Sequence, residues 1–307
     1  MISPTANFKK YLQEKRKEFF ENFDSVYECF FENGFHEKSP DFFRKNASAI
    51  VSSLREGCWD KYKNEENIFN TQVYDDLINN IPNIENLSGR YAIQKFVKDY
   101  SQDIYDMCLS NTQSRRSRAG KEFEAIIELI LLFSDVMVDS QAALGNIYFE
   151  NKNLPKLVDF VSPSCVEYEI DKRQTVVITA KTTLKERWQE IPEEMNRLNA
   201  KEMFLATLDT EVSPKLLEKL KDYNIPLVTT KENRDENYNK ADTAIYSFED
   251  LIRDCVDQGK KWESHSYTPE QKKSIVQNLQ KQIDRHSGHE CVINKLKERI
   301  DFVNAKY

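Results

Sequence analysis

The residues that could perform chemistry in this sequence gather at the end of one short apolar segment. Residues 175–180 (TVVITA) predict a buried strand, and Lys181 follows it directly. Asp159 lies earlier, inside a second short apolar segment, KLVDFV. An acid and a lysine at the ends of two adjacent strands suit phosphodiester hydrolysis. The carboxylate binds a divalent metal that polarises the phosphate, and the lysine offsets the charge that develops on the phosphorane.

A second metal ligand is harder to assign from the residues alone. Nucleases with this chemistry usually carry an acid two residues before the lysine, where this chain has Thr179. The alternatives are the carboxylates at the start of the next helical segment, Glu190, Glu193 and Glu194, and the sequence does not choose between them. Glu124, on the apolar segment KEFEAIIELILLFSDV, could be a further ligand or support one. Acids near a helix start also have an ordinary role, because they complement the helix dipole.

The elements around these residues predict a mixed sheet flanked by helices, which is an α/β fold. Strands are expected at 156–161, 166–170, 175–180, 202–207 and 225–230, and helices at 190–199, 213–222 and 247–256. Residues 5–110 are expected to be mostly helical. Gly34 ends one of these helices, and Pro40 occupies the first turn of the next, which is expected over 39–62. Charged helices return from Thr268-Pro269 to the end of the chain.

Composition limits the function classes. The chain of 307 residues has a formal net charge of −7, which argues against coating of nucleic acid without specificity. A DNA enzyme remains compatible, because the segment NTQSRRSRAGK concentrates basic residues locally. No apolar segment is long enough for a membrane span, and no signal peptide begins the chain, so a cytoplasmic protein is expected. The six scattered cysteines indicate free thiols. His286, His289 and Cys291 lack a fourth zinc ligand, which favours a polar turn.

Three segments in the order SRAGKEFE, LVDFVSPS and AKTTLKERWQEIPEEM resemble type II restriction endonucleases of the EcoRII, SsoII and PspGI group. The resemblance implies the PD-(D/E)xK nuclease fold, and the layout of the chain is most similar to SsoII-like enzymes. In that group the second acid lies on the helix after the lysine, which selects Glu194 and explains Thr179. The resemblance thus implies a catalytic set of Asp159, Lys181, Glu194 and Glu124, with the three acids holding Mg²⁺.

The resemblance also assigns DNA contacts. Lys185 and Arg187 would donate to guanines and Glu186 would accept from cytosine amino groups in the major groove. Gln113 would probe the site from the minor groove. A further group, which would contact phosphates or pair with core carboxylates, is Arg115, Arg116 and Arg118.

Arg55 and Trp59 lie four residues apart, on one face of a predicted helix. Such a pair is commonly amphipathic packing. In SsoII-like enzymes, however, an aromatic ring beside an arginine holds the extruded central base of CCNGG. The resemblance therefore implies a base-flipping pocket at these two residues.

The resulting expectation is a Mg²⁺-dependent type II restriction endonuclease that acts as a homodimer on double-stranded DNA and is paired with a cytosine methyltransferase. It would cut both strands before the first C of CCNGG, leaving 5′ overhangs. Residues 1–110 would form a helical subdomain with the flipping pocket, 111–260 the catalytic and recognition core, and 261–307 helices packed on that core. The alternatives are a repair or recombination nuclease of the same fold, and a DNA-binding regulator without activity.

Overall fold

The computed structural model describes residues 7–18, 22–184, 203–238 and 245–305. The chain divides into two compact units. The first comprises Met1–Cys29 and Glu56–Glu122, and the second comprises Phe30–Arg55 and Phe123–Tyr307. Two long helices, α3 (Pro40–Asn79) and α4 (Gly89–Phe133), contribute to both units.

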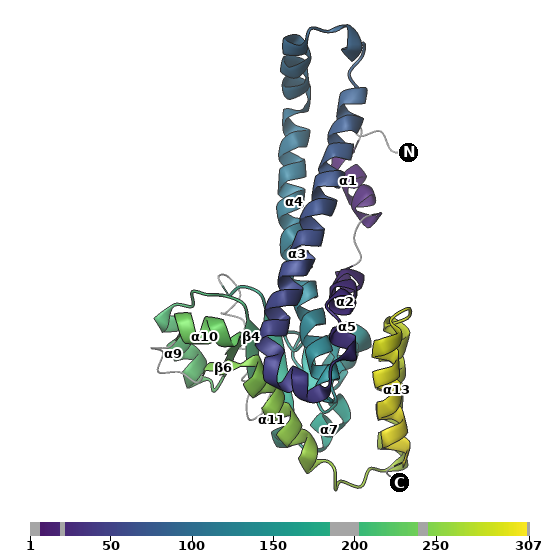
Figure 1. Cartoon of the computed structure of the whole chain (residues 1–307), viewed down its shortest axis with the longest axis vertical. Coiled ribbons are helices and arrows are strands. Elements are labelled where there is room, and N and C mark those ends of the chain that lie inside the picture. Colours follow the sequence, from purple (N-terminus) through teal and green to yellow (C-terminus); the bar gives the residue numbers. More distant parts are fainter. Residues whose placement is uncertain (1–6, 19–21, 185–202, 239–244, 306–307) are drawn as a thin grey trace. The chain divides into compact units, whose positions relative to one another are not determined.

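The first unit is helical. It contains α1 (Phe8–Lys17), most of α2 (Asn22–Glu32), the second part of α3, the 3-10 turn η2 (Ile84–Asn86) and the first part of α4. The two long helices lie side by side (Figure 1), and α1 packs against them through Phe8 and Leu12, which join Phe69, Val73 and Met107 in one apolar cluster. The predicted helical character of residues 5–110 is confirmed for the described residues.

The helix expected over 39–62 is longer than predicted, because α3 continues to Asn79. The other long helix, α4, passes through Gly120 without a break. In each helix the neighbouring residues include fully buried apolar side chains, such as Phe69 and Phe123, whose packing outweighs the weak helix propensity of a single glycine.

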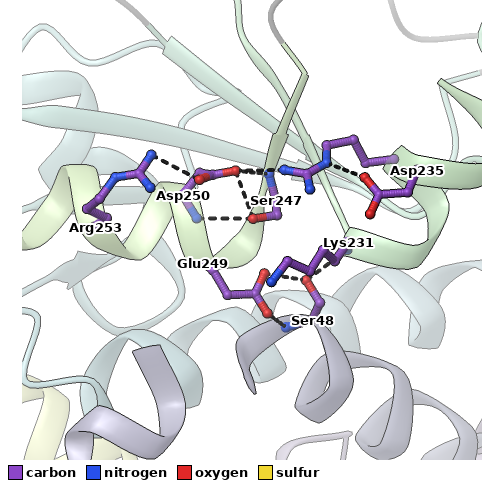
Figure 2. Close-up of polar contacts among 8 residues, drawn as sticks. Ser48, Lys231, Asp235, Ser247, Glu249, Asp250 and Arg253 are labelled. Atoms are coloured by element: carbon purple, nitrogen blue, oxygen red, sulfur yellow. Dashed lines mark hydrogen bonds and ion pairs between the residues drawn. The ribbon is translucent and has the colours of Figure 1, made fainter. Parts of the chain in front are cut away.

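A kink interrupts α3 near its start, within the second unit, where Asn46 has non-helical φ and ψ of −126° and 18°. Just beyond it, the Ser48 amide and hydroxyl donate to the two carboxylate oxygens of Glu249, at 2.9 and 2.6 Å (Figure 2). The Ser48 hydroxyl also accepts from the amide of Lys231 at 2.9 Å. A carboxylate from a distant helix thus caps the resumed part of α3 and ties three helices of the second unit together.

The second unit contains a six-stranded mixed sheet in the order β1-β2-β3-β4-β5-β6. The strands are β1 (Asp139–Ser140), β2 (Phe160–Ser162), β3 (Val176–Lys181), β4 (Met203–Thr207), β5 (Leu227–Thr229) and β6 (Ile245–Ser247). The β1–β2 and β2–β3 pairs are antiparallel, and the remaining pairs are parallel. The predicted α/β mixed sheet flanked by helices is confirmed.

Helices of the second unit cover the sheet. They are α5 (Gln141–Leu144), α6 (Asn146–Asn151), α7 (Cys165–Ile170), α9 (Pro214–Asp222), α10 (Lys231–Asn237), α11 (Phe248–Lys261), α12 (Pro269–Arg285) and α13 (Glu290–Ala305). Side chains of alternate strand residues, Val177, Leu205 and Leu227, join the apolar cluster that includes Phe149 and Leu220. Because alternate residues of a strand point to opposite faces, this cluster defines one buried face of the sheet.

Of the five strands that the sequence predicted, three are confirmed, one is shorter than expected and one is wrong. The strands expected at 175–180, 202–207 and 225–230 are present as β3, β4 and β5, and the strand expected at 156–161 overlaps β2 only at its last two residues, while β1 and β6 were not predicted. The strand expected at 166–170 is wrong, because these residues form helix α7. The Ser164 hydroxyl caps that helix by accepting from the Val166 amide at 3.0 Å. Periodicity alone does not separate a short apolar strand from a buried helix.

The remaining helix predictions divide in the same way. The helices expected at 213–222 and 247–256, and the one beginning at Pro269, are confirmed as α9, α11 and α12, while the helix expected at 190–199 lies outside the described residues. All six cysteines are thiols outside disulfide bonds, as predicted. In the part of the chain that the structure describes, no helix combines the length and apolar character needed to cross a membrane.

Candidate active site

Strand register brings the predicted catalytic acid and lysine together. Phe160 pairs with Ile178 in the antiparallel ladder of β2 and β3, and the Asp159 amide donates to the Ile178 carbonyl at 3.0 Å. Continued by one residue, this register puts Asp159 opposite Thr179. Lys181 lies two residues beyond Thr179 on the same face of the sheet. An acid just before one strand and a lysine at the end of the next therefore meet at one edge of the sheet.

One oxygen of the Asp159 carboxylate is fully engaged. Its Oδ2 lies 3.2 Å from Lys181 Nζ and accepts hydrogen bonds from the Ala180 amide at 2.6 Å and the Thr179 hydroxyl at 3.3 Å. Within the described residues, Oδ1 accepts no hydrogen bond. The three donors fix the orientation of the carboxylate and leave its second oxygen available. Thr179, which replaces the usual acid, thus orients the acid that remains.

The electrostatics of the pair follow from its burial. Asp159 is 8% exposed, and the side chain of Lys181 is 16% exposed. Burial raises the pKa of the Asp159 carboxyl, and Lys181 with the Ala180 amide offsets only part of that rise. A cation beside Oδ1 would stabilise the ionised form. A buried carboxylate with one free oxygen fits a hard divalent cation such as Mg²⁺, which prefers oxygen ligands.

Of the other two predicted metal ligands, the structure describes Glu124 but not Glu194. Glu124 lies on α4 in the second unit, where it is half-buried. Glu194 lies outside the described residues, together with Glu190, Glu193 and the predicted base-reading residues Lys185, Glu186 and Arg187. Among the residues that are described, no group of three His, Cys, Asp or Glu side chains converges as a metal site.

The segment that leaves the catalytic strand is held by a residue that sequence reasoning missed. The Asp209 carboxylate accepts the Leu184 amide at 2.9 Å, and the Asp209 carbonyl accepts from Asn233 Nδ2 at 2.9 Å and Tyr238 OH at 2.7 Å. The parallel pairing of β3 and β4 could have indicated the role of Asp209. Since parallel strands end at the same edge, residues after β4 lie beside residues after β3. Asp209 therefore positions the chain just before Lys185.

In the first unit, Trp59 is partly exposed between cations. Its side chain is 43% exposed. Its ring lies 5.8 Å from the guanidinium carbon of Arg115 and 5.9 Å from Lys63 Nζ, measured to the ring centroid. It also stacks on Tyr62, with the centroids 5.8 Å apart. Arg55 precedes it on α3 and belongs to the second unit. An exposed indole flanked by cations is a surface on which a base could stack.

The basic residues of the NTQSRRSRAGK segment differ in their surroundings. Arg115 Nε donates to both carboxylate oxygens of Glu66, at 3.0 and 3.1 Å. Arg118 is 4% exposed and pairs with Glu122 at 2.5 Å. Both have the carboxylate partners that the sequence left open as an alternative to phosphate contact. Arg116 and Gln113 are exposed on α4.

A buried polar cluster lies in the second unit, consisting of Glu128, Asp139, Asn278, Gln282, Arg285 and His286. Glu128 receives Arg285 Nη1 at 2.8 Å and the Ser140 hydroxyl at 3.0 Å, and it lies 3.2 Å from His286 Nε2. Although burial opposes ionisation, Arg285 and His286 lower the pKa of Glu128 to about 2. His286, considered above with zinc ligands, thus faces a core carboxylate.

The mixed sheet with a buried acid–lysine pair at its edge belongs to the class of restriction-endonuclease-like nucleases. The family model described as "EcoRII C terminal" matches residues 85–252, more than half of the chain. The chain therefore belongs to the EcoRII C-terminal family, as the sequence motifs indicated.

Individual relatives agree with this assignment. The chain is 40% identical over 300 residues to the type II restriction enzyme SsoII of Shigella sonnei, covering 97% of each. It matches metal-depleted Ecl18kI in complex with uncleaved DNA with a TM-score of 0.89 and 39% identity, covering 98% of this chain and all of that one. A complex of PspGI with substrate DNA matches with a TM-score of 0.55 over 80% of this chain, and at 18% identity it supports the fold alone. The chain is a type II restriction endonuclease.

Proposed function

We propose that this enzyme hydrolyses both strands of duplex DNA at CCNGG, before the first C, and leaves 5′ overhangs. The observation that carries the proposal is the Asp159–Lys181 pair, 3.2 Å apart at adjoining strand ends. Likeness to SsoII over nearly the whole chain supports the choice of site. Because the site is palindromic, two copies related by a two-fold axis would act together as a homodimer.

The catalytic residues have distinct roles in this proposal. Asp159, Glu194 and Glu124 would hold Mg²⁺, which when bound would polarise the phosphate and make hydroxide available near neutral pH. Lys181 donates to the scissile phosphate and stabilises the charge that develops there. Thr179 and the Ala180 amide keep the Asp159 carboxylate in the orientation that leaves Oδ1 open. The chain thus supplies a preorganised acid and a cation before the substrate arrives.

Base reading in this proposal begins directly after the catalytic strand. Arg187 donates to guanine O6 and N7, and Glu186 accepts from cytosine N4. Lys185 is a single-point donor to guanine, because its ammonium lacks the planar fork of arginine. The bond from the Leu184 amide to Asp209 supports the proposal, since it anchors the chain one residue before Lys185. Gln113 probes the site from the minor groove.

Trp59 and Arg55 form the base-flipping pocket in this proposal, and the partial exposure of the indole supports it. With 2-aminopurine at the centre of CCNGG, the wild-type protein in Ca²⁺ should change the fluorescence at that position and not at a flanking one. Trp59→Ala should alter the central signal and weaken cognate binding by about 1–3 kcal/mol, the stacking energy of one base. An unchanged central signal in the folded variant would refute the pocket.

The cellular setting follows from the same activity. A cytoplasmic enzyme that cuts CCNGG requires a cytosine methyltransferase to protect the host DNA. Residues 1–110 would carry the flipping pocket, 111–260 the catalysis and base reading, and 261–307 helices that support the core.

Digestion of a DNA of known sequence, with both ends mapped, tests the proposed function. Mg²⁺-dependent cuts before the first C of every CCNGG, on both strands, are the expected result. Cleavage without a fixed short site would instead indicate a repair or recombination nuclease of the same fold. Specific binding with no cleavage in Mg²⁺ would indicate a regulator that has lost catalysis.

A further inference from the structure

A basic cleft of about 560 Å³ lies within the first unit, between helices α1 and α4. Helix α1 has the sequence FKKYLQEKRK, in which five cations accompany one acid. Three of these cations, Lys9, Arg16 and Lys17, line the cleft, and the acid of α1, Glu14, does not. A chain with a net charge of −7 thus concentrates positive charge at one surface of its first unit.

The three cations that line the cleft are one half-buried anchor, Arg16, and two exposed lysines, Lys9 and Lys17. Arg16 Nε donates to the Ser110 hydroxyl at 3.1 Å, and its guanidinium lies 4.2 Å from the centre of the Phe69 ring, which fixes α1 against both long helices. Lys17 is exposed and forms no ion pair within the described residues. Lys9 has a side chain that is 70% exposed, and its ammonium lies 3.7 Å from the carboxylate of Asp106, whose side chain is 12% exposed, so this long pair leaves most of the Lys9 side chain in solvent. The two lysine charges therefore remain available to a ligand.

The opposite wall of the cleft, on α4, includes neutral hydrogen-bonding side chains beside Asp106, Leu109 and the buried Arg118. Gln113, Ser114 and Ser117 line it, and Gln113 and Ser117 are exposed. Lysine and serine side chains are among the groups that commonly contact DNA phosphates, and Gln113 keeps its proposed place at the minor groove. Asp106 is the single acid among the lining residues. The cleft combines exposed lysines with neutral donors, a set that suits a row of phosphates.

We propose that this cleft binds the sugar–phosphate backbone of duplex DNA, with Lys9 and Lys17 each neutralising one phosphate. The inference rests on the proposed function only in requiring that the protein bind DNA. Backbone contacts of this kind carry no sequence information and release counterions, so they set the affinity for every DNA and its dependence on salt. Helix α1 would thereby hold the duplex while residues elsewhere read it.

The test is the salt dependence of binding to a random-sequence duplex in Ca²⁺, which is independent of the cleavage site. For Lys17→Ser, the slope of log K against log salt should become shallower by about 0.9, and affinity at 0.1 M salt should fall about eightfold. Lys9→Ser/Lys17→Ser should double the change in slope, and a CCNGG duplex should lose affinity by the same factor as the random one. Lys10→Ser is the matched control, because Lys10 is exposed on the same helix and does not line the cleft.

Unchanged slopes in both cleft variants, with unfolding temperatures equal to that of the wild type, would overturn the proposal. Equal losses in Lys10→Ser and Lys17→Ser would also overturn it, since they would mark a general effect of charge rather than a contact. If the variants show the expected changes in slope but the wild type fails to cut CCNGG, the proposed function fails while the backbone contact stands.

Discussion

Two buried aspartates in neighbouring strands of one sheet have contrasting surroundings. Asp139, in β1, is 2% exposed, and Asp159, beside β2, is 8% exposed. Asp139 Oδ2 accepts from the Cys165 amide at 2.9 Å and Asn278 Nδ2 at 2.8 Å, and its Oδ1 accepts from Gln282 Nε2 at 3.2 Å. Asp159 concentrates all of its donors, including the Lys181 ammonium, on one oxygen.

The difference separates a carboxylate that holds the fold from one arranged to act on a ligand. Neutral donors satisfy both oxygens of Asp139, so its removal would leave buried donors without acceptors. Asp159 keeps one oxygen without a hydrogen bond among the described residues. A buried acid whose pKa is shifted by its surroundings and which has a charged partner is common in catalytic sites.

A large loss of cleavage is expected when Lys181, the cationic partner of Asp159, is replaced. Lys181→Ala should lower the single-turnover cleavage rate by about a thousandfold, since it removes a donor to the developing phosphorane charge. Affinity for the duplex in Ca²⁺ should change much less. Lys215→Ala, at an exposed lysine of α9, is the control and should cut at the wild-type rate. A rate within tenfold of the wild type would remove Lys181 from the mechanism.

A large loss of stability is expected from a substitution in the buried polar cluster that contains Asp139. Glu128→Ala leaves the buried His286 and the partly exposed Arg285 without their acid. Breaking a buried ion pair costs about 3–5 kcal/mol, measured here by urea unfolding. The folded fraction of the variant should still cleave DNA. A loss below about 1 kcal/mol would show that the cluster is not a support of the second unit.

A smaller effect is expected on the pH dependence of the protein's stability. Burial raises the pKa of Asp139 from 3.8 to about 6, so the folded protein takes up a proton before the unfolded chain does as the pH falls. Protonation of Asp139 therefore adds stability to the wild type between pH 7 and pH 5. Glu128 stays ionised there, because its pKa is about 2.

Comparing the unfolding temperatures of the wild type and Asp139→Asn separates the titration of Asp139 from that of all other groups. The unfolding temperature of the wild type, relative to that of the variant, should rise as the pH falls from 7 to 5. A difference that stays constant over this range would show that Asp139 does not titrate there.

How far the sequence predicted this molecule depended on the range of the interactions involved. The strand that ends at Lys181 was predictable, because a run of β-branched and apolar residues is a local signal. The pairing of Asp159 with Lys181 was predictable as a juxtaposition, since both mark strand ends. The role of Thr179 as a donor to Asp159 required the antiparallel register, which no local pattern contains.

The same limit explains what was missed. Asp209 holds Leu184 across two parallel strands, and Glu249 caps α3 from about 200 positions away along the chain. The misassigned strand at 166–170 failed for a different reason, because the Ser164 cap decided between two conformations that the apolar pattern left equal. The roles of Asp209 and Glu249 could not be predicted from local patterns, because they depend on contacts between segments that are distant in the sequence.

The most direct test of the account measures the two aspartates side by side. Asp159→Asn and Asp139→Asn should each be assayed for single-turnover cleavage of a CCNGG duplex in Mg²⁺, normalised to the folded fraction, and for the free energy of unfolding. We predict that Asp159→Asn loses cleavage by several orders of magnitude and retains wild-type stability, while Asp139→Asn loses about 1–3 kcal/mol of stability and cleaves at the wild-type rate per folded molecule. Wild-type cleavage by folded Asp159→Asn would contradict the account.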